Sequence, residues 1–261
     1  MIDHERSHYP LSHTRSDVGP QPYGSGNYWL SVYPHQGARV PALILWFFDS
    51  RSFVGKGPTP KQADYHWIDD KTVPGYIKSQ ARLMRRAWGE LPPSLVFTHI
   101  PFQVTTYLSK LYVSLPSNSK PSVFDVLGFI RPSQGSHDDD KIDHQGNLHG
   151  RYTGLDLRAL RQLVALESVL AITSGHEHGN SWCATSNESY IATSNESYNL
   201  NMCFNGHSGY GGYTTEHSRV RNGRVFSATL KDRSSVRSWN TYEDGTRNEH
   251  VVLGHGYHKE A

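Results

Sequence analysis

Short apolar runs separated by polar turns predict a mixed α/β chain. Residues 42–48 are continuously apolar and end at Asp49, a pattern typical of a strand buried on both faces. Shorter runs of the same kind predict strands at residues 28–33, 95–98 and 170–173. The last third of the chain is rich in further strand candidates, at residues 200–204, 224–230 and 236–239.

Two segments have the apolar spacing or composition of helices. In residues 155–170, Leu157, Leu160, Leu163 and Val164 recur at helical spacing, which predicts an amphipathic helix. Residues 78–88 have helical composition and end at Gly89. The polar stretch before Gly26 has no periodicity and is predicted to be loop, as is the Ser-, Asp- and Gly-rich stretch 117–147.

Charge and composition exclude several classes of protein. The 261 residues include 26 Lys and Arg against 24 Asp and Glu, which excludes a strongly basic nucleic-acid-binding protein, so we expect no nucleic-acid partner. The longest apolar run is far shorter than the ~20 residues that span a bilayer, so we expect no membrane span. Two cysteines indicate neither a disulfide framework nor a cysteine zinc site. The polar N-terminus lacks a secretory pattern, which favours a cytoplasmic location.

Histidines follow two of the predicted strands. His99 comes after the run 95–98, and Gly175-His176-Glu177-His178 comes after the run 170–173. Ligand sites in layered α/β folds lie at the carboxyl ends of strands, and residues i and i+2 of an extended chain point the same way. Imidazole is the commonest metal ligand. We therefore expect these histidines to converge on a metal site; the alternative is that 175–178 is a polar turn.

These motifs give the chain a resemblance to a known family. Phe97-Thr98-His99-Ile100-Pro101 and Gly175-His176-Glu177-His178 resemble the C-terminal motif pair of calcineurin-like metallophosphoesterases. The purple-acid-phosphatase-like branch, which includes the fungal cell-cycle-regulating phosphatase, is the closer resemblance. It rests on the segments 45–50, 65–68 and 174–180, and on residues 203–204 leading into 209–213. The resemblance covers roughly residues 3–239 of a domain taken as 1–261, and leaves the tail 240–261 unassigned.

The resemblance implies a fold, an activity and a set of ligands. The fold would be a four-layer α/β/β/α sandwich, and the activity a metal-dependent phosphoric-ester hydrolase acting on a phosphoprotein or a small molecule. Two divalent or transition metal ions, of the Fe, Zn or Mn type, would lie about 3.5–4 Å apart, clamp a phosphate oxygen and activate water. Carried over by motif, His99 and His176 would bind one metal and His178 the other.

The chain departs from the family at its N-terminal end. The family's remaining ligands come from an Asp-x-His block, a Gly-Asp block and a Gly-Asn-His-Asp block, all preceding these histidines. Met1-Ile2-Asp3 aligns with the end of the last block, and Asp64-Tyr65-His66 lies too late in the chain to supply the first. We therefore expect an incomplete domain whose N-terminal half is missing and whose bimetallic centre is weakened. The alternative function is a catalytically inactive fragment or pseudo-phosphatase that acts only as a binding protein.

Two other groups of residues have competing interpretations. His207 and the glycines of 206–212 either line a substrate mouth or form a Gly-rich turn that places two tyrosines, and we favour the turn. Asp138, Asp139 and Asp140 suggest a metal site, but a solvated charge run in a loop is the better interpretation.

Overall fold

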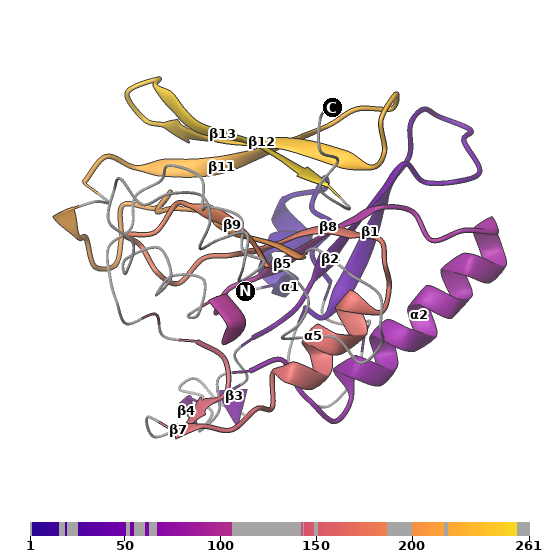
Figure 1. Ribbon diagram of the computed structural model, residues 1–261, viewed down its shortest axis with the longest axis horizontal. Helices are drawn as coiled ribbons and strands as arrows, with labels where there is room; N and C mark the ends of the chain where they lie inside the picture. The colour runs from indigo at the N-terminus through magenta and orange to yellow at the C-terminus, as the bar shows by residue number, and fades with distance from the viewer. Residues whose placement is uncertain are drawn as a thin grey trace, which may run out of the picture.

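A six-stranded sheet lies at the centre of the computed structural model, between two helices and a second, three-stranded sheet (Figure 1). The structure describes residues 2–15, 19, 26–50, 53–54, 61–62, 67–105, 142, 144–148, 151–186, 200–216 and 219–254. The mixed α/β prediction is confirmed, with a principal sheet whose central strands are parallel.

The strands of the six-stranded sheet lie in the order β1-β2-β5-β8-β10-β9. They are β1 (Tyr28–Val32), β2 (Leu43–Phe47), β5 (Ser94–Thr98), β8 (Val169–Ser174), β10 (Leu200–Phe204) and β9 (Cys183–Ser186). The four inner strands β2, β5, β8 and β10 run parallel, and the edge strands β1 and β9 run antiparallel to their neighbours. Every residue of β8 and β10 is buried, as expected for strands covered on both faces.

Two helices cover one face of this sheet (Figure 1). Helix α2 (Val73–Trp88) begins earlier than the predicted residue 78, with Pro74 in its first turn, where a proline is tolerated. Its buried residues Val73, Ile77, Ala81 and Met84 follow helical spacing and pack into the core with the sheet. Gly89 ends α2 in the left-handed region at φ 79° and donates its N–H to the Arg85 carbonyl.

Helix α5 (Leu157–Val164) is shorter than the sequence predicted. The predicted helix 155–170 ran into the next strand, because Leu166 and Leu170 continue the apolar spacing. In the structure Glu167 has φ 57°, which turns the chain out of the helical conformation before β8 begins at Val169. Leu160 and Leu163 are fully buried against the sheet, and burying each contributes about 1.5–3 kcal/mol.

The second sheet packs on the opposite face (Figure 1). It contains β11 (Asn222–Ala228), β12 (Ser235–Tyr242) and β13 (Arg247–Gly254), paired antiparallel in that order. Val236 and Leu253 meet Leu95, Leu170 and Ala171 of the six-stranded sheet in a buried cluster. The predicted strands 224–230 and 236–239 correspond to β11 and β12, whereas β13 lies in the tail that sequence reasoning left unassigned.

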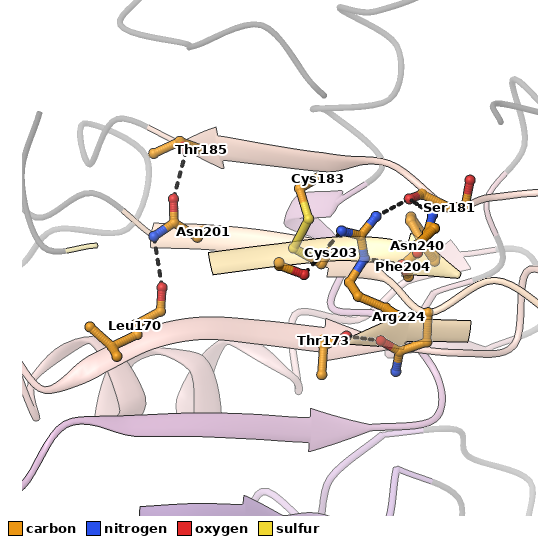
Figure 2. Close-up of a disulfide and its surroundings, with 12 residues drawn as sticks. Leu170, Thr173, Ser181, Cys183, Thr185, Asn201, Cys203, Phe204, Arg224 and Asn240 are labelled. Carbon is orange, nitrogen blue, oxygen red and sulfur yellow. Dashed lines mark hydrogen bonds between the residues drawn. A yellow bond between two sulfur atoms is a disulfide. The ribbon is translucent and has the colours of Figure 1, made fainter. Parts of the chain in front are cut away.

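Cys183 and Cys203 form a disulfide between β9 and β10, buried on the side of the second sheet (Figure 2). The two residues are direct partners in the antiparallel register, with Cα atoms 4.1 Å apart. A single pair of cysteines gave no reason to predict this bond. Disulfides persist mainly in oxidising compartments, so the pairing does not favour the cytoplasmic location expected from the N-terminus.

Short elements complete the described chain. Helix α1 (Ile2–His8) lies where the sequence predicted loop, so that prediction was wrong for these residues. The two-residue strands pair as β3 (Phe53–Val54) with β4 (Lys61–Gln62) and β6 (Asn147–Leu148) with β7 (Arg151–Tyr152). Most of the predicted loop 117–147 lies outside the described residues. Within the part of the chain that the structure describes, no helix is long and apolar enough to cross a membrane.

Candidate functional site

The carboxyl ends of the parallel strands meet at one edge of the six-stranded sheet, and an open cavity of about 380 Å³ lies there. Polar residues that follow three different strands line it: Asp49 after β2, His99 after β5 and Asn205 after β10. The remaining lining residues are mostly aromatic or small: Gly26, Tyr28, Phe47, Phe48, Phe97, Thr98 and Gly175. This is the edge at which ligands bind in open α/β sheets.

His99 and His176 lie side by side at this edge. Nε2 of His99 is 3.3 Å from Nδ1 of His176, and the two rings are nearly perpendicular, with centroids 5.1 Å apart. The strand register causes this approach, because Thr98 of β5 is the direct partner of Ser174 of β8. The predicted convergence of these two histidines is therefore present in the structure.

Gly175 allows the two chains to approach so closely. Its N–H donates to the His99 carbonyl at 3.0 Å, and a Cβ at this position would lie 3.2 Å from Nδ1 of His99. His176 then adopts φ 70°, a left-handed conformation that is uncommon for a residue other than glycine. A non-glycine residue held in this region often marks a functional site.

His178 takes a different orientation from His176. Its Nδ1 lies 2.6 Å from the Tyr213 carbonyl oxygen, and its backbone N–H donates to the Tyr213 hydroxyl at 3.0 Å. That hydroxyl in turn donates to the His176 carbonyl at 3.0 Å. Because a carbonyl only accepts, Nδ1 of His178 carries a proton, and in the neutral ring Nε2 carries the lone pair. This tautomer is the one in which a histidine ligates a metal through Nε2.

The ring of His178 is held between two other rings. Tyr213 stacks on it at a centroid distance of 4.0 Å with planes 5° apart, and His207 stacks at 3.7 Å with planes 23° apart. Within the described residues, no three His, Cys, Asp or Glu side chains are grouped so as to hold one metal ion. The structure therefore pairs His99 with His176 and places His178 in a separate cluster with His207 and Tyr213.

His207 is buried and fully hydrogen bonded. Its Nε2 donates to the Gly211 carbonyl at 3.0 Å, and its Nδ1 accepts from the Arg221 guanidinium at 2.9 Å. Burial lowers the pKa of the His207 imidazole. Arg221 also donates to the Thr214 hydroxyl at 2.9 Å. His207 is thus a neutral ring fixed behind His178.

Tyr210 and Glu243 continue this network outward. The Tyr210 hydroxyl donates to one carboxylate oxygen of Glu243 at 2.8 Å, and the other oxygen accepts the Arg221 backbone N–H at 3.2 Å. The hydrogen bond from Tyr210 lowers the pKa of Glu243. The stretch 206–212 is a loop with a bend at 209–212. It brings His207, and Tyr213 directly after it, against His178. The interpretation as a turn that places two tyrosines did not anticipate the contact of His207.

Sequence reasoning missed Asp49 and Asn205 as site residues. Asp49 donates its backbone N–H to the Asn27 side-chain oxygen at 2.9 Å, and the Asn205 side-chain oxygen accepts from the Thr173 hydroxyl. The signal that identified His99, a polar residue directly after an apolar strand, was also present at Asp49 and Asn205. Asp64, His66 and the run 138–140 lie outside the described residues.

No model of a protein family matches the chain, and comparison with proteins of documented function gives no match either.

Proposed function

We propose that this chain carries the histidine half of a metal-dependent phosphoric-ester hydrolase site of the calcineurin-like type. The observation that carries the proposal is the 3.3 Å separation between His99 Nε2 and His176 Nδ1. Two nitrogens bound at 2.0–2.1 Å to one tetrahedral zinc ion lie about 3.3 Å apart. The pair thus has the spacing of two ligands to one transition metal, at the sheet edge where ligands bind.

The donor set supports a transition metal. Imidazole suits Zn and Fe, and a carboxylate, which suits Mn, is supplied by Asp49 in the cavity that His99 lines. His99 and His176 would hold one metal ion and His178, through Nε2, a second. When bound, such a pair clamps a phosphate oxygen and activates water for attack. The layers of helices, sheet and second sheet support three layers of the proposed four-layer sandwich, in which ligands other than these histidines would complete the metal site.

His178 favours a second candidate function, metal binding without turnover. Its ring packs between Tyr213 and His207 rather than beside the His99–His176 pair. If this arrangement persists when metal is present, the chain binds one ion through the pair and has no second ion with which to clamp a phosphoester. The protein would then act as a binding protein.

The experiment compares metal binding with hydrolysis in the same preparations. The chain is stripped with a chelator and titrated with Co²⁺, whose visible absorption reports imidazole ligation, and hydrolysis of 4-nitrophenyl phosphate is measured with Zn²⁺, Mn²⁺ or Fe²⁺. His176→Ala should abolish binding of the ion held by the His99–His176 pair, whereas His35→Ala, which removes an exposed histidine elsewhere, should not. Turnover that depends on His176 and on metal supports the hydrolase. Binding without turnover supports the second candidate, and absence of His176-dependent binding contradicts both.

A further inference from the structure

A second cavity, of about 310 Å³, lies on the outer face of β12 and β13. Val236, Ser238 and Asn240 of β12 are buried toward the six-stranded sheet, so Arg237 and Trp239, which alternate with them, lie on the opposite face. The cavity is lined by Arg237, Ser238, Trp239, Arg247, His250, Val251 and Val252. It contains none of the residues of the histidine site.

Two aromatic rings form part of this cavity. The rings of Trp239 and His250 are nearly parallel, with centroids 5.8 Å apart and planes 19° apart. Trp239 is half-buried, and its indole Nε1 is a buried donor for which the described residues supply no acceptor. Because Nε1 is buried, a ligand in the cavity would contact the ring of Trp239 rather than this N–H.

Two guanidinium groups flank the rings. Arg237 lies two positions before Trp239 on β12, and Arg247 is the partner of Thr241, two positions after Trp239. At about 3.3 Å per residue, each arginine begins roughly 7 Å along the sheet from the indole. Both arginines are exposed, and within the described part of the chain no acidic residue lines the cavity. The described lining therefore carries the two positive charges of Arg237 and Arg247 and no carboxylate.

The volume limits the ligand. Pockets for small molecules range from about 300 to 1,000 Å³, so a cavity of about 310 Å³ suits a compact ligand. Arginine binds the planar oxygens of carboxylates and phosphates through paired donors, and aromatic rings stack on flat ligands. We propose that this cavity binds a small organic anion with a flat ring, held by stacking on the Trp239–His250 pair and by hydrogen bonds from Arg237 and Arg247.

The test uses ring-bearing anions that a phosphatase cannot hydrolyse. Benzoate and phenylphosphonate are titrated into ¹⁵N-labelled protein, and the indole N–H resonance of Trp239, assigned by its loss in Trp239→Phe, is followed. The two probes distinguish a carboxylate ligand from a phosphate-type ligand. At least one of them should shift this resonance saturably. Benzyl alcohol, a ring without charge, and inorganic phosphate, an anion without a ring, should each bind about tenfold more weakly or worse.

Variants separate specific recognition from general charge. By calorimetry, Arg237→Gln and Arg247→Gln should each weaken binding about tenfold, the loss expected when a charge-assisted hydrogen bond is removed. Arg219→Gln changes the net charge equally but lies outside the cavity, and should bind as the parent does. The proposal is overturned if neither probe moves the Trp239 resonance, if benzyl alcohol or inorganic phosphate binds as tightly as the better probe, or if Arg219→Gln weakens binding as much as the two cavity variants.

Discussion

The ring of His178 lies against the ring of His207, with centroids 3.7 Å apart and planes 23° apart. These residues are far apart in the sequence, and the stack exists because the chain after β10 turns back over the end of β8. His207 is in turn held by Arg221 and by the Gly211 carbonyl. The Gly-His-Glu-His motif directly follows β8. The orientation of His178 is therefore fixed by residues that come later in the chain, after β10.

Removing His207 should weaken metal binding through His178. In His207→Ala the stacking partner is lost, and outer residues that orient a ligand typically account for about 10–100-fold in metal affinity. His207→Phe keeps a flat ring and should recover part of the affinity. The measurement is a Co²⁺ titration of the parent and both variants. Equal affinity in His207→Ala and the parent would show that His178 takes no part in the metal site.

Two adjacent glycines provide a matched pair of variants. A Cβ on Gly212, which has φ +82°, would lie 2.9 Å from Cε1 of His178, whereas a Cβ on Gly211 would meet nothing within 4 Å. Gly212→Ala should displace the His178 ring and cost about 1–2 kcal/mol for the left-handed backbone alone. Gly211→Ala should do neither. Urea unfolding gives the free energies, and the His178 Cε1–H resonance reports the ring; identical behaviour of the two variants would contradict the prediction.

Asp156 should make stability depend on pH in a definite direction. Its carboxylate is buried and accepts from the Gln103 backbone N–H at 2.9 Å and from the Tyr152 hydroxyl at 2.8 Å. Burial raises its pKa above the usual value of 3.8. The folded chain therefore holds this proton to a higher pH than the unfolded chain does. The protonated carboxyl therefore makes its whole contribution to the free energy of unfolding below pH 3.8. That contribution is lost as the pH rises through the pKa of the folded state.

Asp156→Asn isolates this contribution. The free energy of unfolding of the parent and of Asp156→Asn is measured in urea at several pH values. As pH rises above about 4, the parent should lose stability relative to Asp156→Asn. Because other acids contribute equally to both proteins, the difference removes their effect. A difference that is constant with pH would mean that Asp156 has the same pKa in the folded and unfolded chains.

The disulfide should contribute measurably to stability. Closing a loop of 20 residues removes entropy from the unfolded chain that corresponds to about 3 kcal/mol. Replacing Cys183 and Cys203 together by Ser should lower the free energy of unfolding by about that amount, and the parent in reductant should approach the double variant. If reductant leaves the parent unchanged while the double variant is destabilised, the packing of sulfur rather than the bond accounts for the loss.

Arg224 connects the two sheets and should not tolerate lysine (Figure 2). Its guanidinium donates to the Phe204 carbonyl at 2.9 Å, to the Ser238 hydroxyl at 3.2 Å and to the Ser181 carbonyl. A lysine ammonium lacks the planar fork that serves these acceptors together. Arg224→Lys should cost about 1–3 kcal/mol in urea unfolding, whereas Arg219→Lys, at an exposed position, should cost little. Similar costs for both would contradict a role between the sheets.

Local sequence patterns were sufficient to predict five strands of the principal sheet and to predict that His99 lies beside His176. Apolar runs place β1, β2, β5, β8 and β10 nearly where they lie, since each strand carries its own burial pattern. The strand-end rule then brings the two histidines together, because parallel neighbours end at the same edge. The predicted bounds of the helices were less accurate than those of the strands. The apolar spacing of α5 continues into β8 without a break, so the turn at Glu167 left no local signal.

Only the tertiary structure determined the contacts between segments that are distant in the sequence. The Cys183–Cys203 bond depends on the register of β9 against β10, and the packing of His178 depends on where the chain carrying His207 and Tyr213 returns. The cavity beside Trp239 depends on the pairing of β12 with β13, whose own pattern is too polar to predict. The sequence determined which residues lie next to each other along a strand. Register and the return path of the chain, set by the packing of two sheets, determined which side chains meet.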